Sequence, residues 1–189
     1  MNMDDKMLYV RLAGALLTVR QFSEAKSGYV AALNHGATEK SIAYYIGVWH
    51  YLQGEYAAAD EWFKRYLPCG DEMTIAVIYW HTLCCARIGK EAELLTMIRD
   101  DMKVGHHTAY LTAMRVFDKT VDPETAITAL EDEKSDLNFV VTAYGLCVYF
   151  EKTGDHARVE LIRTRLLEKE GVWPCISYLA AWNDAVTRR

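Results

Sequence analysis

The sequence has little of what separates domains or forms disulfides. Three prolines and eleven glycines are spread over 189 residues, and no stretch is rich in Pro or in Ser and Gly, so no linker is visible. We therefore expect a single domain over residues 1–189. The five cysteines form no Cys-x-x-Cys pair, and their odd number leaves one outside any set of disulfides. Reduced, mostly buried thiols in a cytoplasmic protein fit this pattern best.

The sequence also lacks a cluster of basic residues. The formal net charge is −5 and the Lys and Arg residues are scattered, whereas binding to a nucleic-acid backbone needs a clustered basic face. We expect no nucleic-acid partner. The apolar stretch at residues 7–19 follows two acidic residues and contains Arg11, unlike a secretion signal, which begins with positive charge and has an uninterrupted apolar part. We expect a buried helix there and no membrane span.

What the sequence does contain is a repeat. A shift of 34 residues places the first segment on the second, so that Leu12 falls on Ile46, Ala13 on Gly47, Phe22 on Tyr56, Ala25 on Ala59, Tyr29 on Phe63 and Leu33 on Leu67. Small residues at Ala13, Gly47, Ala25 and Ala59 allow two helices of one unit to approach closely. Gly54 stands where the first helix of the second unit should end. A period of 34 with two helices per unit is typical of a helical repeat protein.

These residues resemble the tetratricopeptide repeat family. The pattern Tyr9-x-x-Leu12-Ala13 is followed by Ala25-x-x-x-Tyr29, and a later copy has Ala143-x-x-Leu146-Cys147 before Gly154-Asp155. Residues 75–186 are also similar to the NlpI-like bacterial tetratricopeptide proteins, in which a short degenerate pair precedes a well-formed repeat and a last helix. The resemblance implies an all-α fold, a right-handed α-solenoid of tetratricopeptide type.

The apolar pattern predicts further helices after the first two pairs. We expect them at residues 75–88, 91–102, 107–118 and 124–131, which with the later copy gives about five helix pairs. A last helix, opened by Pro174, should cap the solenoid with an apolar side made of Ile176, Leu179, Trp182 and Val186.

No pattern of catalytic or metal-binding residues stands out. His50 and His81 show neither His-x-x-x-His nor His-x-x-Glu spacing, so we expect no metal, and no cofactor motif is visible. Cys84 and Cys85 follow His81 by three and four residues, which would allow contact along a helix. We interpret them as small apolar residues of a packed helix and expect no enzyme activity, with a cysteine-dependent enzyme as an alternative.

The resemblance also implies a binding face, because the first helices of this family line a concave groove that receives peptides. The matching positions are Tyr44, Tyr45, Val48 and Tyr51 in the second copy, Tyr79, Trp80 and Leu83 in the third unit, and Tyr144 and Val148 in the later copy. We expect a non-catalytic scaffold or adaptor that binds a protein or peptide segment in this aromatic groove. A homodimer through the terminal helices is a secondary expectation.

Two other interpretations stay open at this point. The chain could be a regulatory module that senses a peptide or a small ligand. Aromatic residues at helical spacing are also common in a buried core, which would remove them from any binding face.

Overall fold

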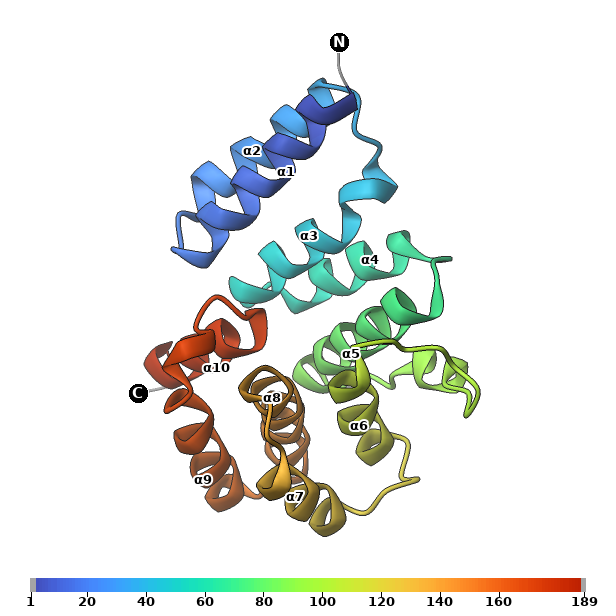
Figure 1. Ribbon diagram of the computed structural model, residues 1–189, viewed down its shortest axis with the longest axis vertical. Coiled ribbons are helices and arrows are strands. Elements are labelled where there is room, and N and C mark those ends of the chain that lie inside the picture. Colours follow the sequence, from blue (N-terminus) through green and yellow to red (C-terminus); the bar gives the residue numbers. More distant parts are fainter. Residues whose placement is uncertain (1–2, 188–189) are drawn as a thin grey trace. The chain divides into compact units, whose positions relative to one another are not determined.

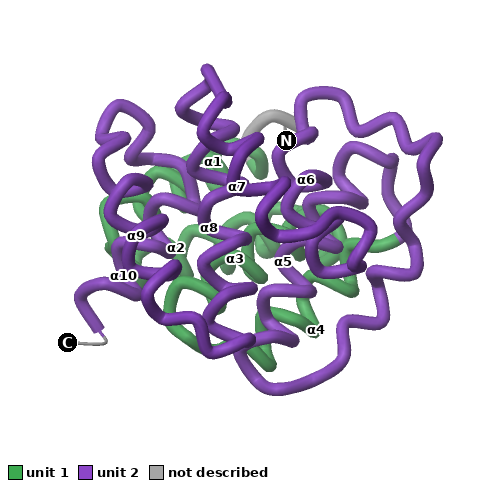
Figure 2. Tube along the Cα trace, turned by 90° about the horizontal axis from the view of Figure 1, so that it is seen from below, with its two compact units in different colours: residues 1–67 green, residues 68–189 purple. Residues whose placement is uncertain are grey.

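The computed structural model describes residues 3–187, with side chains from residue 6 onward, and every regular element in this part is helical (Figure 1). The all-α expectation is therefore confirmed. The chain divides into two compact units, residues 1–67 and residues 68–189, coloured separately in Figure 2. The single domain expected from the sequence stays a prediction. No described helix is both long enough and apolar enough to span a membrane.

Unit 1 consists of two helix pairs. The helices are α1 (Met3–Thr18), α2 (Phe22–Asn34), α3 (Glu39–Leu52) and α4 (Tyr56–Tyr66), and α1 packs on α2 as α3 packs on α4. A reciprocal cap starts α3, because the Thr38 hydroxyl accepts from the Ser41 amide while the Ser41 hydroxyl accepts from the Thr38 amide. Gly54 follows α3 with φ of +78°, a conformation that suits glycine.

Small residues set the distance between the helices of each pair. Ala25 and Ala59 are fully buried, which confirms the burial expected from the 34-residue repeat. A Cβ atom on Gly47 would lie 2.7 Å from the Phe63 ring, and one on Gly28 would lie 2.8 Å from the Ala13 Cβ. Because such distances are shorter than van der Waals contact, the helices could not approach this closely with larger residues.

The first helix leaves apolar side chains in solvent. Leu8 and Leu12 of α1 are 65% and 52% exposed, and Val19, directly after the helix, is 55% exposed, while Val10 and Leu17 are buried. Leu8 and Leu12 are four positions apart and so share one face of the helix. A homodimer through a terminal helix stays a prediction.

Unit 2 contains six α-helices and two short 3-10 helices among its described residues. They are α5 (Asp71–Ile88), η1 (Glu93–Met97), α6 (Thr108–Phe117), α7 (Pro123–Asp132), α8 (Asp136–Thr153), α9 (His156–Leu167), η2 (Glu170–Val172) and α10 (Ile176–Thr187). The helices expected at 107–118 and 124–131 are found as α6 and α7 to within one residue at each end. The helix expected at 75–88 is found as α5, which ends at residue 88 as expected but starts four residues earlier.

The expectation of a helix over residues 91–102 is wrong, because only the five residues of η1 are helical there. None of these five residues is buried, and a short amphipathic helix is stable only when its apolar face packs against a neighbour. The segment contacts α5, and polar contacts also hold it. Arg99 Nη2 donates to Asp71 Oδ1 over 3.0 Å, and the Lys103 amide donates to Asp71 Oδ2 over 3.1 Å.

Two helices form the core of unit 2. Every residue of α5 from Thr74 to Cys85 is buried, and α8 is buried from Phe139 to Val148. Within the unit, α5 packs on α6 and α8, while α8 also packs on α9 and α10. A helix that is buried on all sides presents no face to solvent. The residues of α5 and α8 that were expected to line a groove are therefore not exposed.

A buried charge cluster lies inside unit 2. The guanidinium of Arg87 on α5 contacts the carboxylates of Glu151 on α8 and Asp184 on α10. The three side chains are only 5%, 15% and 10% exposed. The Tyr144 hydroxyl donates to the same Asp184 carboxylate over 3.3 Å. The cluster thus ties three helices together through charge-assisted hydrogen bonds.

The last helix matches its expected packing side only in part, since Leu179 is buried and Ile176 is half-buried. Its buried residues are Ser177, Leu179, Ala180, Ala181 and Asp184. Trp182 and Val186, expected on the apolar packing side, are 39% and 43% exposed. The small residues Ala180 and Ala181 let α10 lie close to α8 and α9, which turns the larger side chains outward.

Candidate functional site

Most residues of the expected groove lie in the core. Seven of the nine are buried, namely Val48, Tyr51, Tyr79, Trp80, Leu83, Tyr144 and Val148, and none of these is more than 3% exposed. Tyr44 is half-buried and Tyr45 is 38% exposed. The expectation that these side chains form one exposed aromatic surface is therefore wrong.

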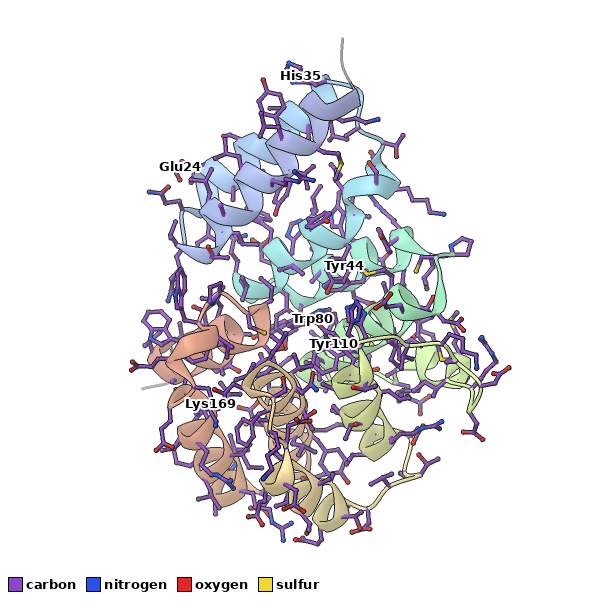
Figure 3. All side chains as sticks on the ribbon, viewed as in Figure 1. Glu24, His35, Tyr44, Trp80, Tyr110 and Lys169 are labelled. Carbon is purple, nitrogen blue, oxygen red and sulfur yellow. The ribbon has the colours of Figure 1, made fainter. Side chains whose placement is uncertain are left out.

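A hydrogen bond to the hydroxyl group allows a tyrosine to be buried in the core of unit 2. The Tyr79 hydroxyl donates to the Val141 carbonyl oxygen over 2.8 Å, and its ring meets the Tyr110 ring edge-on at 4.8 Å. Trp80 on α5, labelled in Figure 3 with Tyr110, lies 6.3 Å from the Tyr144 ring, measured between ring centroids. These rings stabilise unit 2 by packing and are closed to a partner.

Tyr44, also labelled in Figure 3, belongs to an aromatic cluster of unit 1. Its ring centroid lies 5.8 Å from that of Phe63, 5.9 Å from that of Tyr66 and 6.0 Å from that of Tyr45. Three aromatic neighbours at these distances fix the ring in place. Only Tyr45 of the nine residues therefore presents a large part of its side chain to solvent.

A different hollow of unit 1 has the composition of a binding pocket. Its volume is about 320 Å³ and its wall is made by three helices, with four residues from α2, four from α3 and one from α4: Lys26, Tyr29, Val30, Leu33, Glu39, Ile46, Trp49, His50 and Trp62. Six of the nine are aromatic or aliphatic. Ligand pockets are typically apolar hollows of about 300–1,000 Å³ with a few polar groups, and we call this one the aromatic pocket.

Helical periodicity brings these residues to one place. Lys26, Tyr29, Val30 and Leu33 follow the three- and four-residue spacing of one face of α2, and Ile46, Trp49 and His50 do the same on α3. The Trp49 indole N–H donates to the Phe22 carbonyl oxygen over 2.8 Å, which fixes the ring. The aromatic pocket is therefore largely formed before any ligand arrives.

Charged groups surround the aromatic pocket. Lys26 Nζ lies 5.3 Å from the centroid of the Trp49 ring, and the Arg65 guanidinium carbon lies 4.4 Å from that of Trp62. Both distances are within the range of a cation–π interaction. The two tryptophans thus have cations on their faces, and Lys26 is an exposed residue of the wall.

A hollow in the described part of unit 2 is of another kind. It has a volume of about 500 Å³, and its wall is mostly charged or polar: Glu160, Arg163, Thr164, Leu167, Glu168, Glu170, Asp184 and Ala185. Such a surface stays hydrated and offers little apolar area to an incoming side chain. It does not have the composition of an anchor site.

The cysteine and histidine pair on α5 lacks the geometry of an activated thiol. Cys85 Sγ lies 3.7 Å from His81 Nε2 and 3.8 Å from Nδ1. A hydrogen bond in the ring plane would bring the sulfur much closer to one nitrogen than to the other. His81 is completely buried and Cys85 is 1% exposed, so a substrate would not reach them. We interpret the pair as core packing.

The remaining thiols give no sign of reactivity. None of the five cysteines forms a disulfide, and Cys84, Cys85 and Cys147 are buried. Burial raises the pKa of the Cys147 thiol and of the Cys175 thiol, which keeps both protonated and unreactive at neutral pH. The cytoplasmic location expected from the cysteine pattern stays a prediction.

Comparison with known proteins adds no relative. No protein-family model, no curated protein and no solved structure matches the chain. The tetratricopeptide resemblance therefore depends on the residues of this chain alone, and the candidate site depends on the geometry described above.

Proposed function

We propose that the chain is a non-catalytic binding protein that takes an apolar or aromatic side chain of a protein segment into the aromatic pocket of unit 1. The observation that carries the proposal is the wall itself, in which Tyr29, Trp49 and Trp62 come together from three helices. Aromatic rings offer a large contact area and lose little rotamer freedom on binding, and they are common anchors at protein interfaces.

The size of the aromatic pocket supports a single side chain as its occupant. A volume of about 320 Å³ is at the lower end of the range for ligand pockets. The wall is partly open, since Val30 is 48% exposed and Trp62 is half-buried. An anchor could therefore enter while the rest of the segment stays on the surface.

We also propose that the helix pairs of unit 1 are repeats of tetratricopeptide type. The 34-residue shift supports this, because Ala25 and Ala59 are buried at matching positions and Tyr29 and Phe63 are buried four residues later. In this proposal the binding site differs from the groove of first helices, because the aromatic pocket takes most of its wall from α2 and α3 together.

Selection from a random peptide library on the purified intact chain tests the proposal. Selected peptides should share an aromatic or large apolar residue and should bind Trp62→Ala about thirtyfold more weakly, which corresponds to about 2 kcal/mol for a strong anchor contact. Trp62 is chosen because it is less buried than Trp49, whose indole holds the Phe22 carbonyl. Circular dichroism should show unchanged helical content in the variant.

Trp182→Ala is the matched control, since Trp182 is a 39% exposed tryptophan of unit 2. It removes the same ring from a surface outside the aromatic pocket and should leave peptide binding unchanged. Peptides that bind Trp62→Ala as tightly as the unaltered chain would contradict the proposal.

A further inference from the structure

The helix α1 of unit 1 has a second apolar side, which lies in solvent. Leu8 and Leu12 are 65% and 52% exposed, and Ala15 is exposed on the same side, because the three residues are four and three positions apart. The residues of the opposite side are buried in unit 1: Val10, Ala13 and Leu17. A helix at the surface of a domain needs one apolar side for the core, and a contiguous second one is typical of an interaction site.

The turn after α1 keeps Val19 beside these residues. The Arg20 amide donates to the Leu17 carbonyl oxygen over 3.0 Å, and the Gln21 amide donates to the Leu16 carbonyl oxygen over 2.9 Å. This pair of bonds ends a helix tightly when the residue after the last turn is left-handed, as Arg20 is with φ of +64°. Val19 is 55% exposed. We call the four exposed apolar residues the α1 stripe: Leu8, Leu12, Ala15 and Val19.

The second repeat shows that this side of a first helix is covered by another helix. The 34-residue shift gives the matching residues of α3, with Leu8 on Ile42, Leu12 on Ile46 and Ala15 on Trp49. Ile42 is fully buried and Trp49 is 8% exposed. The helix α2 supplies cover there, because it contacts α3 and its Phe22 carbonyl oxygen accepts from the Trp49 indole over 2.8 Å. The α1 stripe therefore lies on the side of a first helix against which this fold packs a helix.

We propose that the α1 stripe pairs with the α1 stripe of a second copy of this chain, in antiparallel orientation about a twofold axis. The order of its residues favours this occupant, because the spacing of four, three and four positions is the same when read from either end. An antiparallel copy thus places Leu12 on Ala15 of the second copy and Leu8 on Val19 of the second copy. A self-complementary surface of this kind closes at two copies.

The sizes of the side chains favour the antiparallel orientation over the parallel one. In the antiparallel pair each contact joins a larger side chain to a smaller one, so the two helices approach evenly along the α1 stripe. A parallel pair would place Leu12 on Leu12 and Ala15 on Ala15, which leaves a gap at the alanines. Arg11, an exposed residue that borders the stripe, would face Thr18 of the second copy in the antiparallel pair, so the two arginines would not oppose each other.

Sedimentation equilibrium of the intact chain tests the pairing. A contact made by one helix of each copy is small, so a reversible dimer is expected, with a transition within the range of about 1–500 μM. Leu12→Lys should weaken dimerisation about thirtyfold or more, because each dimer then buries two ammonium groups without a partner. Leu12 is exposed, so circular dichroism should show unchanged helical content in the variant.

Leu161→Lys is the matched control. Leu161 of α9 is 63% exposed, so the same substitution is made at an exposed leucine outside the α1 stripe. The dissociation constant of the dimer should not change. A general effect of added positive charge would instead weaken dimerisation equally in Leu161→Lys and Leu12→Lys, and this result would overturn the inference.

A mixture of two variants tests the orientation. Ala15→Glu alone should weaken dimerisation, as Leu12→Lys does. When the two variants are mixed, the antiparallel pair brings the introduced lysine of one chain onto the introduced glutamate of the other and leaves the second Leu12–Ala15 contact intact. The mixed dimer should therefore be about tenfold tighter than the dimer of either variant alone. A parallel pair does not bring the two substituted positions together.

The remaining outcomes are equally decisive. An intact chain that stays monomeric over the whole concentration range would overturn the inference, as would a dimer that persists in Leu12→Lys, because another surface would then hold it. A mixture that dimerises no more tightly than the separate variants would overturn the antiparallel pairing. None of these results bears on the proposed function, since no residue of the α1 stripe lines the aromatic pocket.

Discussion

Arg87→Met is expected to lower the free energy of unfolding by about 3–5 kcal/mol, measured by urea denaturation. The Arg87 side chain is 5% exposed and contacts the carboxylates of both Glu151 and Asp184. Removing the cation leaves two negative charges close together in a poorly hydrated place. Methionine keeps much of the length of the side chain, so the loss comes from the charge rather than from a cavity.

Two further variants show where this loss arises. Arg99→Met removes a 54% exposed arginine that pairs with Asp71 and Asp101, and the change in stability should be far smaller because water screens these charges. A triple variant that also replaces Glu151 with Met and Asp184 with Leu should recover most of the stability lost in Arg87→Met. Equal losses in Arg87→Met and Arg99→Met would contradict the description of a buried cluster.

The same substitution at two glycines is expected to change stability in opposite directions. In Gly145→Ala the new Cβ would lie 2.7 Å from the Ala113 Cβ and 3.0 Å from Tyr79 Cε2. The Ala113 Cβ is attached directly to the backbone, so α6 and α8 have to move apart. We expect a loss of about 1–3 kcal/mol in the free energy of unfolding.

Gly14→Ala is the matched variant in α1. A Cβ on Gly14 meets no atom within 4 Å, so the substitution should only remove the flexibility that glycine gives a helix. A gain of about 0.5–1 kcal/mol is expected. If both variants gain stability, the close approach of α6 and α8 at Gly145 is not as described.

The sequence predicts where the helices of this chain lie better than it predicts which of their faces are buried. Boundaries depend on local chemistry, as where Asp122 accepts from the amides of Glu124 and Thr125 to begin α7. The 34-residue shift correctly marks Ala25 and Ala59 as buried. By contrast, residues 91–102 have a helical pattern, yet none of the five residues of η1 is buried, and burial is a tertiary fact that the local pattern does not contain.

The binding face could not be predicted in the same way. Exposure of Tyr79 or Tyr144 depends on helices that are distant in the sequence and that cover α5 and α8 from several sides. Tyr29, Trp49 and Trp62 belong to three helices, and each alone is explained as a core aromatic residue.

The indole N–H signals of the five tryptophans, assigned by Trp→Phe variants, test the central claim most directly. In a titration of the intact chain with p-cresol, a small aromatic probe, the signals of Trp49 and Trp62 should shift and reach saturation, because both rings line the aromatic pocket. The signals of Trp80, Trp173 and Trp182 should stay in place, since none of these residues lines the aromatic pocket. Saturable shifts confined to Trp173 or Trp182, or no shift at any probe concentration, would contradict binding in the aromatic pocket.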